Sequence, residues 1–175
     1  MLILQSFIVI PARAVEAVYK LLDKKYSGQV TMSHAGLKPK ARMANESEFL
    51  SGEKTIMVAT SAFGMGIDLD SVDLVIHFNM SLSLTDYMQQ SGRAGRNGQK
   101  AHAVLLYSDE DYYTNLEILH NGHPTLRGME QLDMMREFCD DNKHCMAQLL
   151  MEHFGQKMKK SCKHCTVCQK NRRKK

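Results

Sequence analysis

The chain has 175 residues, of which 43% are hydrophobic, and this length suits one domain with a small appendage rather than a two-lobed motor. No run approaches the roughly 20 apolar residues that cross a bilayer, and the first ten residues lack the pattern of a secretion signal. We therefore expect a soluble, cytoplasmic protein. Residues 157–175 contain nine basic residues and no acid. Such a segment usually contacts nucleic acid or another polyanion, although a solvated, disordered tail is the alternative.

Apolar and β-branched runs predict strands over residues 5–10, 29–32, 55–59, 74–78 and 101–107. Helical patterns lie over residues 13–26 and 39–50. A further helix is expected to begin at a Ser83 cap, with Asp86 three residues on, and to run through Tyr87 towards residue 93. The strands are spaced too widely for hairpins, so they predict an α/β fold with a parallel sheet flanked by helices. Ligands of such sheets gather at the carboxyl ends of the strands.

Helical patterns replace strands after residue 108. They cover residues 109–121, 126–141 and 145–154. We therefore predict an α/β domain over residues 1–108 and a small helical, cysteine-bearing domain with a basic tail over residues 109–175.

Two arginines, Arg93 and Arg96, stand among glycines with no acid at helical spacing to pair with either. If the segment is helical, Gln89 shares a face with both. Gly92 and Gly95 would weaken a helix by roughly 1 kcal/mol each relative to alanine, a cost that is easier to explain if the backbone passes close to another group. A phosphate fits, because guanidinium can bind it through two parallel hydrogen bonds. An exposed basic helix end is the alternative.

The cysteines form a second pattern, with two residues between each of the last three and seventeen positions from the first to the second: Cys145, Cys162, Cys165 and Cys168. Four thiolates predict a structural zinc ion, because four protein ligands leave no position for an activated water. Disulfides compete with this interpretation, but five is an odd number and no secretion signal is present. Cys139 is expected to lie outside the site, and His144 and His164 stay open as substitute ligands.

Residues 60–68, followed by the segment from Gln89 to Gly98, resemble motifs V and VI of superfamily-two helicases. Ser-His-Ala-Gly-Leu at residues 33–37 and the phrases at residues 62–68 and 75–78 narrow the resemblance to the RecQ family of DNA helicases. The cysteines agree with the zinc subdomain that follows the motor in that family. The resemblance implies a second RecA-like lobe, the helicase C-terminal lobe, with a zinc-binding subdomain behind it.

The resemblance also implies catalytic and nucleotide-binding residues. Arg96 would act as the arginine finger on the γ-phosphate of ATP held by another lobe, and Arg93 and Gln89 would support it. Gly66 and Asp68 resemble positions near the ribose and the cleft between lobes, so with the two arginines they are the expected cofactor-binding residues.

DNA-binding residues follow from the same resemblance. Thr60 and Ser61, at the carboxyl end of a predicted strand, would hold a phosphate of single-stranded or partly duplex DNA, and the loop of His34 would lie along the same strand. An ordinary loop histidine and an ordinary strand end are the alternatives for His34 and Thr60.

The chain departs from the family in two respects. It has no Gly-x-x-x-x-Gly-Lys-Ser/Thr loop and no acidic magnesium motif, and Met146 and Ala147 stand where arginines usually follow the first zinc cysteine. We therefore expect no ATP hydrolysis by this chain alone, and ATP with Mg²⁺ only together with a first RecA-like lobe in cis or in trans. The expected function is the C-terminal half of a RecQ-like 3′ to 5′ DNA helicase at a bacterial-type nucleoid. The alternative is a non-catalytic nucleic-acid-binding zinc module.

Overall fold

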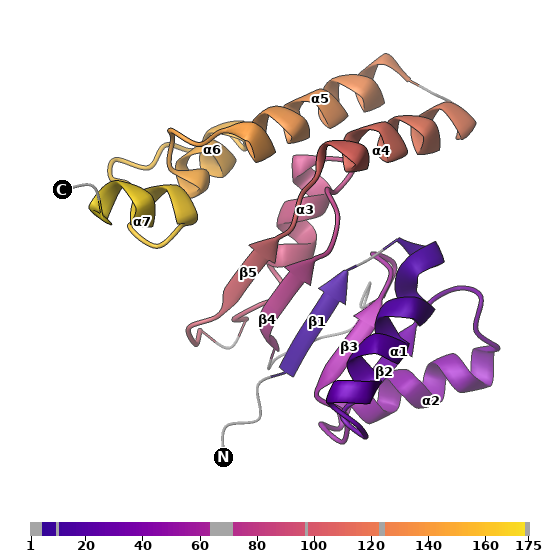
Figure 1. Cartoon of the computed structure of the whole chain (residues 1–175). Coiled ribbons are helices and arrows are strands. Elements are labelled where there is room, and N and C mark those ends of the chain that lie inside the picture. The colour runs from indigo at the N-terminus through magenta and orange to yellow at the C-terminus, as the bar shows by residue number, and fades with distance from the viewer. Residues whose placement is uncertain (1–4, 10, 64–71, 97, 123–124, 174–175) are drawn as a thin grey trace. The chain divides into compact units, whose positions relative to one another are not determined.

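The computed structural model describes the chain except for residues 1–4, 10, 64–71, 97, 123–124 and 174–175 (Figure 1). It divides into two compact units. Unit 1 comprises Met1–Asn79 and Gln89–Ser108, and unit 2 comprises Met80–Met88 and Asp109–Lys175. Residues 80–88, which the sequence division placed in the first domain, thus group with the helices after residue 108. Among the described helices, none is long and apolar enough to cross a membrane.

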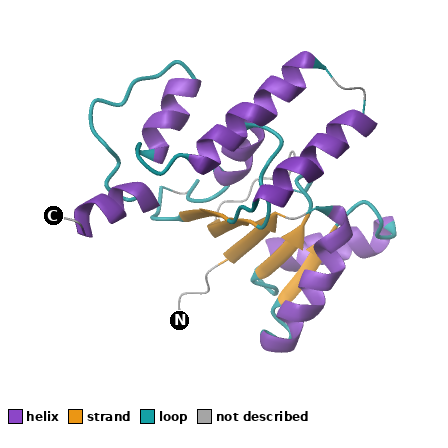
Figure 2. Ribbon diagram, turned by 45° about the horizontal axis from the view of Figure 1, so that its top comes forward, coloured by secondary structure: helices purple, strands orange, loops and turns teal. Residues whose placement is uncertain are grey.

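Unit 1 is built on a parallel sheet with the strand order β2-β3-β1-β4-β5 (Figures 1 and 2). The strands are β1 (Gln5–Val9), β2 (Val30–Ser33), β3 (Ile56–Ala59), β4 (Val72–His77) and β5 (His102–Leu105). The predicted parallel α/β sheet is confirmed. Because all strands point the same way, their carboxyl ends form one edge of the sheet and their amino ends form the other.

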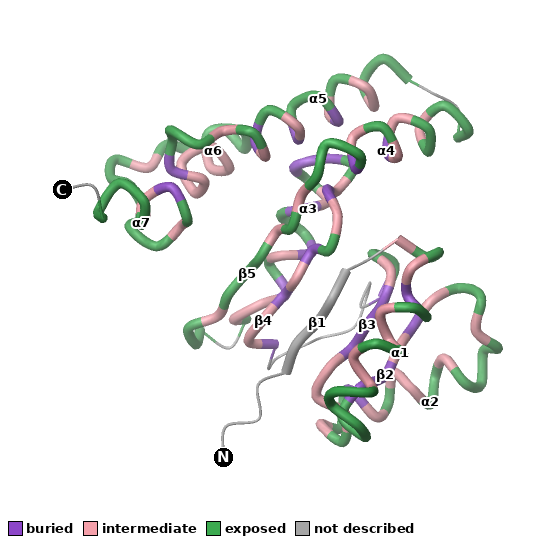
Figure 3. Tube along the Cα trace, in the orientation of Figure 1, coloured by how far each residue is buried: buried purple, intermediate pink, exposed green. Residues whose placement is uncertain are grey.

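Helices cover both faces of this sheet. The short η1 (Ala12–Ala14) leads into α1 (Val15–Lys25), and α2 (Pro39–Leu50) lies between β2 and β3. Val15 of α1 packs with Val58 of β3, whereas Phe49 of α2 packs with Met57 of the same strand. Since neighbouring residues of a strand point to opposite faces, α1 and α2 lie on opposite sides of the sheet. Among the residues of unit 1 whose burial is described, those of the sheet that are buried lie on β2, β3 and β4 (Figure 3).

Helix α3 (Leu84–Ser91) begins in unit 2 and ends in unit 1. The predicted cap is confirmed: Ser83 Oγ accepts a hydrogen bond from the Asp86 N–H at 3.0 Å and donates one to the Asp86 carboxylate at 2.6 Å. The bond from the Asp86 N–H is the N-cap bond of a helix start, and the bond to the carboxylate orients the Ser83 hydroxyl.

Besides the first part of α3, unit 2 contains four more helices in the described part of the chain. They are α4 (Asp109–Asn121), α5 (Leu126–Asp140), α6 (Met146–His153) and α7 (Thr166–Arg173). Helices α4 and α5 lie side by side (Figures 1 and 2). Helix α7 was not predicted from the sequence, because only one of its residues, Val167, is both apolar and buried.

Two contacts explain why residues 80–88 belong to unit 2. The Asp111 carboxylate accepts a hydrogen bond from the Met80 N–H at 3.2 Å, and the Asn115 side chain donates to the Met80 carbonyl at 2.9 Å. Both side chains are buried on α4. The Tyr87 ring of α3 also packs against Phe138 of α5, with 5.8 Å between ring centroids.

Candidate functional site

The segment that carries Arg93, Gly95 and Arg96, which we call the arginine loop, follows the end of α3 at Ser91, so the helix stops before the two arginines. The Arg93 N–H donates to the Gln90 carbonyl at 3.2 Å, and the chain then turns until the Gly95 N–H donates to the Val72 carbonyl at 3.0 Å. Val72 is the first residue of β4. The arginine loop is therefore fixed at the amino edge of the sheet.

Gly95 shows why the loop needs a glycine. Its φ is +73°, in the left-handed region, and a Cβ added there would meet Ala101 Cβ and the Gln99 carbonyl oxygen at 3.0 Å each. Both conditions exclude a larger residue. The sequence led us to expect that the backbone at the glycines passes close to another group. At Gly95 that group belongs to this chain: it is the Gln99 carbonyl and the Ala101 side chain.

The two arginines differ in exposure. Arg93 is only 3% exposed, whereas Arg96 and Gln89 are exposed. Burial, followed by the neighbouring charge of Arg96, lowers the pKa of Arg93. The common helical face is not formed, because of the three residues only Gln89 lies on the helix. The structure instead packs one guanidinium into the fold and leaves the next one accessible.

A buried pair that sequence reasoning missed anchors the end of α3. His77 Nε2, at the last residue of β4, lies 2.9 Å from Gln90 Oε1, and both side chains are buried. In the tautomer with the proton on Nε2, the ring donates this bond to the Gln90 side-chain oxygen. Burial lowers the pKa of His77 to about 4, against the raising effect of its hydrogen bonds to Gln90 and the Val104 backbone. No spacing in the sequence could have indicated this contact between a strand and a helix thirteen residues later.

The predicted DNA-binding residues lie together at the carboxyl edge of the sheet. The Thr60 N–H donates to the Ser33 carbonyl at 3.3 Å, and the Thr60 carbonyl accepts from the Phe63 N–H at 3.0 Å. The first bond joins the start of the loop after β3 to the last residue of β2, and the second closes a turn within the loop after β3. The first bond brings the segment of the exposed Ser61 close to the end of β2, which His34 follows directly.

His34 is turned into its own loop. Its Nδ1 accepts a hydrogen bond from the Gly36 N–H at 3.2 Å, its Nε2 lies 3.9 Å from a Glu16 carboxylate oxygen, and the side chain is only 10% exposed. The ring therefore shapes the loop backbone rather than projecting from it. Gly66 and Asp68, the other expected nucleotide contacts, lie outside the described residues.

The four predicted zinc cysteines come together in unit 2. The sulfur atoms of Cys145, Cys162, Cys165 and Cys168 all lie within 4.8 Å of one another. Tetrahedral zinc with Zn–S bonds of about 2.3 Å would hold them about 3.8 Å apart, so the four sulfurs are near enough to ligate one ion.

Backbone N–H groups point at these sulfurs, as thiolate ligands require. Cys145 Sγ accepts from the Cys162 N–H at 3.2 Å, and Cys162 Sγ accepts from the N–H groups of His164 and Cys165 at 3.4 and 3.3 Å. Burial opposes ionisation of Cys145, but such hydrogen bonds lower its pKa to about 6. Lys163 adopts a φ of 62°, which turns the loop between the second and third cysteines back on itself.

The remaining candidates do not join the cluster. His144 Nδ1 lies 2.7 Å from an Asp141 carboxylate oxygen, and only the four cysteines are grouped as ligands in the described part of the chain. Burial and the nearby charges of Asp140 and Asp111 raise the pKa of Cys139 to about 12, so this thiol stays protonated.

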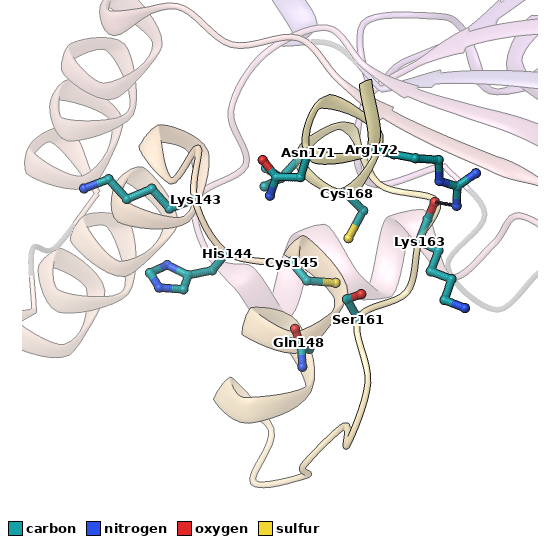
Figure 4. A pocket seen from close by; sticks show the side chains of 10 residues that line it. Lys143, His144, Cys145, Gln148, Ser161, Lys163, Cys168, Asn171 and Arg172 are labelled. Atoms are coloured by element: carbon teal, nitrogen blue, oxygen red, sulfur yellow. Dashed lines mark hydrogen bonds between the residues drawn. The ribbon is translucent and has the colours of Figure 1, made fainter. Parts of the chain in front are cut away.

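A cavity of about 520 Å³ opens beside the thiols (Figure 4). Its lining includes Cys145 and Cys168, polar side chains such as Gln148 and Asn171, and three basic residues. No acidic residue lines it in the described part of the chain. The zinc cluster thus borders a space of positive character.

Comparison with known proteins matches both parts of the chain. Residues 4–98 match the model of the helicase conserved C-terminal domain, and residues 109–169 match the RecQ zinc-binding model. The zinc expected from the cysteines is confirmed by this match and by their clustering, and it is a structural cofactor of the chain.

Individual relatives agree with the family models. The chain is 36% identical over 159 residues to the ATP-dependent DNA helicase hus2/rqh1 of Schizosaccharomyces pombe and 32% identical over 137 residues to the ATP-dependent DNA helicase RecQ of Bacillus subtilis. These matches cover 87% and 77% of this chain but only 12% and 23% of the two relatives.

Solved structures share the fold at lower identity. The C-terminal domain of the DEAD-box protein Dbp5 matches with a TM-score of 0.53 at 22% identity, covering 70% of this chain and 72% of that one. Domain 2 of the DEAD-box helicase Mss116p, solved with an RNA duplex, matches with a TM-score of 0.55 at 19% identity, covering 74% and 56%. The predicted RecA-like fold is confirmed. The chain belongs to the RecQ family of helicases and carries the family's conserved helicase C-terminal domain together with its zinc-binding domain.

Proposed function

We propose that this chain forms the C-terminal half of a RecQ-like ATP-dependent 3′ to 5′ DNA helicase. It would supply an arginine finger, part of the track for single-stranded or partly duplex DNA, and a structural zinc site. Its partner would be a first RecA-like lobe that holds ATP and Mg²⁺, in cis or in trans. The protein would act in the cytoplasm, at the nucleoid; its similarity to DNA helicases of bacteria supports this location.

The observation that carries the proposal is the separation of the two candidate sites on one sheet. The hydrogen bond from Gly95 to Val72 holds the arginine loop at the amino edge, and the bond from Thr60 to Ser33 holds the other loops at the carboxyl edge. A motor lobe needs both: one surface for the nucleotide of its partner and another for the strand that it moves.

For the nucleotide, Arg96 is the group suited to contact a phosphate, because it is exposed beside a buried and anchored Arg93. An anchored loop limits the entropy lost when the guanidinium takes its position. On a γ-phosphate this charge would stabilise the negative charge that develops during transfer. Gln89 would bind beside it from the last turn of α3.

For DNA, Thr60 and Ser61 offer hydroxyl groups, and Ser61 adds an exposed position at the carboxyl edge. The His34 ring would act indirectly by shaping its loop. Contacts of this kind position a phosphate backbone without reading its sequence.

In unit 2, the four cysteines would be the zinc ligands, and zinc when bound cross-links the start of α6 to the loop before α7 and to α7 itself. The N–H bonds to the sulfurs already orient these side chains. Between residues 141 and 173 the buried apolar residues are Cys145 and Val167, so this part of unit 2 would gain much of its folding energy from such a cross-link.

The test measures DNA-stimulated ATP hydrolysis of the full chain, alone and mixed with a separately produced first RecA-like lobe. We expect no turnover alone and turnover in the mixture, and the Arg96→Ala variant should reduce the latter by about 10³-fold or more. Arg42→Ala, which removes another partly exposed arginine, on α2, is the control and should leave turnover unchanged.

Robust turnover by the chain alone would contradict the proposal. Salt-dependent DNA binding without turnover in any mixture, unaffected by Arg96→Ala, would favour the alternative function of a non-catalytic nucleic-acid-binding zinc module.

A further inference from the structure

The last two residues of β2 are held from α2 as well as from the sheet. Strand β2 lies at one edge of the sheet, and among the described strands it pairs with β3 alone (Figure 1). An edge strand has no backbone partner on its outer side. Asn45 Nδ2 of α2 donates to the Met32 carbonyl at 2.8 Å, and the Ser33 hydroxyl donates to Glu46 Oε1 at 2.7 Å. These two bonds anchor β2 at the point where it ends.

The bond from Ser33 to Glu46 has the length of a strong hydrogen bond, because 2.7 Å is typical of a hydroxyl that donates to a carboxylate. Ser33 is only 3% exposed, so its hydroxyl would lose free energy without this acceptor. Arg42 Nε lies 3.9 Å from the same carboxylate oxygen, but this contact is long and partly exposed, and such pairs contribute little. The main role of the Glu46 carboxylate is therefore to hold Ser33.

The turn from Thr60 to Phe63 depends on α2 at both of its ends. At its start, the Thr60 N–H donates to the Ser33 carbonyl at 3.3 Å. At its end, the Phe63 ring packs edge-on against the Phe49 ring of α2, with 6.0 Å between the centroids. Glu46 and Phe49 are three residues apart on α2, so they lie on the same face of that helix. This face holds one end of the turn directly and the other end through Ser33.

We propose that Glu46 is a positioning residue for the DNA contact at Thr60. Its carboxylate holds Ser33, and the Ser33 carbonyl in turn places the Thr60 backbone and hydroxyl at the carboxyl edge of the sheet. The proposal rests on the DNA track of the proposed function and adds to it a residue that does not touch the DNA.

The negative charge of Glu46 makes this role easy to recognise. A carboxylate near a DNA strand repels the phosphates, so the removal of an ordinary acid from this region would strengthen binding. A carboxylate that positions a phosphate ligand has the opposite effect, because its removal displaces the ligand. The sign of the change in affinity therefore distinguishes the two roles.

The test measures the affinity of the full, zinc-loaded chain for a fluorescent single-stranded DNA at one fixed salt concentration. Thr60→Ala should weaken binding about 5-fold, the loss expected for one hydrogen bond. Glu46→Ala should cause a loss of similar size. Glu46→Gln should restore the affinity, because its amide oxygen can still accept the bond from Ser33. The matched control Glu48→Ala removes another carboxylate of α2 and should not weaken binding.

A double-mutant cycle separates positioning from a general loss of structure. If Glu46 acts through Thr60, the Thr60→Ala/Glu46→Ala variant should bind no more weakly than Thr60→Ala alone, because the contact is already lost. A merely structural role would lower the affinity by the same factor in both backgrounds. Ser33→Ala removes the donor of the same bond and should reproduce the effect of Glu46→Ala. It replaces Glu46→Ala in the cycle if circular dichroism shows that the latter is unfolded.

Additive losses in the cycle would overturn the proposal. So would unchanged or tighter binding of the folded Glu46→Ala variant while Thr60→Ala weakens binding. Unchanged binding of Thr60→Ala would instead refute the DNA track of unit 1 and, with it, the role of Glu46.

Discussion

Acidification should destabilise unit 1 through one buried histidine, His77. Its ring is completely buried between β4 and α3, and burial lowers its pKa to about 4 in the folded chain, against 6.5 for the unperturbed group. The folded state therefore favours the neutral ring. Between pH 6.5 and 4 the unfolded chain binds a proton that the folded chain excludes, so stability is fully present above this window and falls as the pH is lowered through it.

The magnitude follows from the two pKa values. Linkage gives a loss of about 2 kcal/mol between pH 7.5 and pH 5, and about 3 kcal/mol once the pH is below both values. The free energy of unfolding of a domain is typically about 5–15 kcal/mol, so protonation of this single histidine would remove a sizeable part of it.

The assay is urea unfolding followed by circular dichroism at pH 7.5 and pH 5. Because carboxylates also titrate in acid, the informative quantity is the difference between wild type and His77→Gln, whose amide can still donate to the Gln90 carbonyl oxygen. Between pH 7.5 and pH 5 the free energy of unfolding should fall by about 2 kcal/mol less in the variant than in the wild type. His120→Gln, at an exposed position on α4, is the control and should behave as the wild type. An equal loss of stability in His77→Gln and wild type would refute the reasoning.

Three further predictions concern unit 2. Asp111→Ala removes the acceptor of the buried Met80 N–H and should lower the free energy of unfolding by about 1–3 kcal/mol, whereas Glu117→Ala on the exposed side of α4 should change it by less than about 0.5 kcal/mol, as urea titration would measure. Lys163→Gly relieves a left-handed residue and should slow zinc release to a chromogenic chelator, consistent with a gain of roughly 0.5–1 kcal/mol; faster release would count against it. Removal of zinc should expose four thiols to a thiol reagent while Cys139 reacts slowly, and a chain with all five thiols equally reactive before chelation would contradict the cluster.

The parallel sheet could be predicted from sequence because its signals are local. Each strand is a run of apolar or β-branched residues, and the Ser83 cap is read from neighbouring residues alone. The zinc cluster could be predicted for a similar reason, since paired cysteine spacings limit how the thiols can meet.

The failures share a physical cause, which is dependence on distant contacts. The end of α3 before Arg93 is set where the chain turns to reach Val72, and its anchor is the bond between Gln90 and His77. Helix α7 is polar almost throughout, and its order comes from Cys168 and from side chains that bind the carbonyls of Lys163 and His164. Neither kind of contact leaves a periodic pattern in the sequence.

The position of the arginine loop has a consequence for how the lobe would work. Strand β4 begins at Val72, which holds the loop through Gly95, and ends at His77, which holds α3 through Gln90. Over this strand the two edges of the sheet are roughly 17 Å apart, too far for a nucleotide phosphate and a DNA phosphate to share ligands. Any coupling between them has to pass through the packed strands and α3. We therefore expect Gln90→Ala, which touches neither ligand, to weaken the coupling of ATP hydrolysis to DNA in the reconstituted motor while leaving DNA binding by the chain alone unchanged.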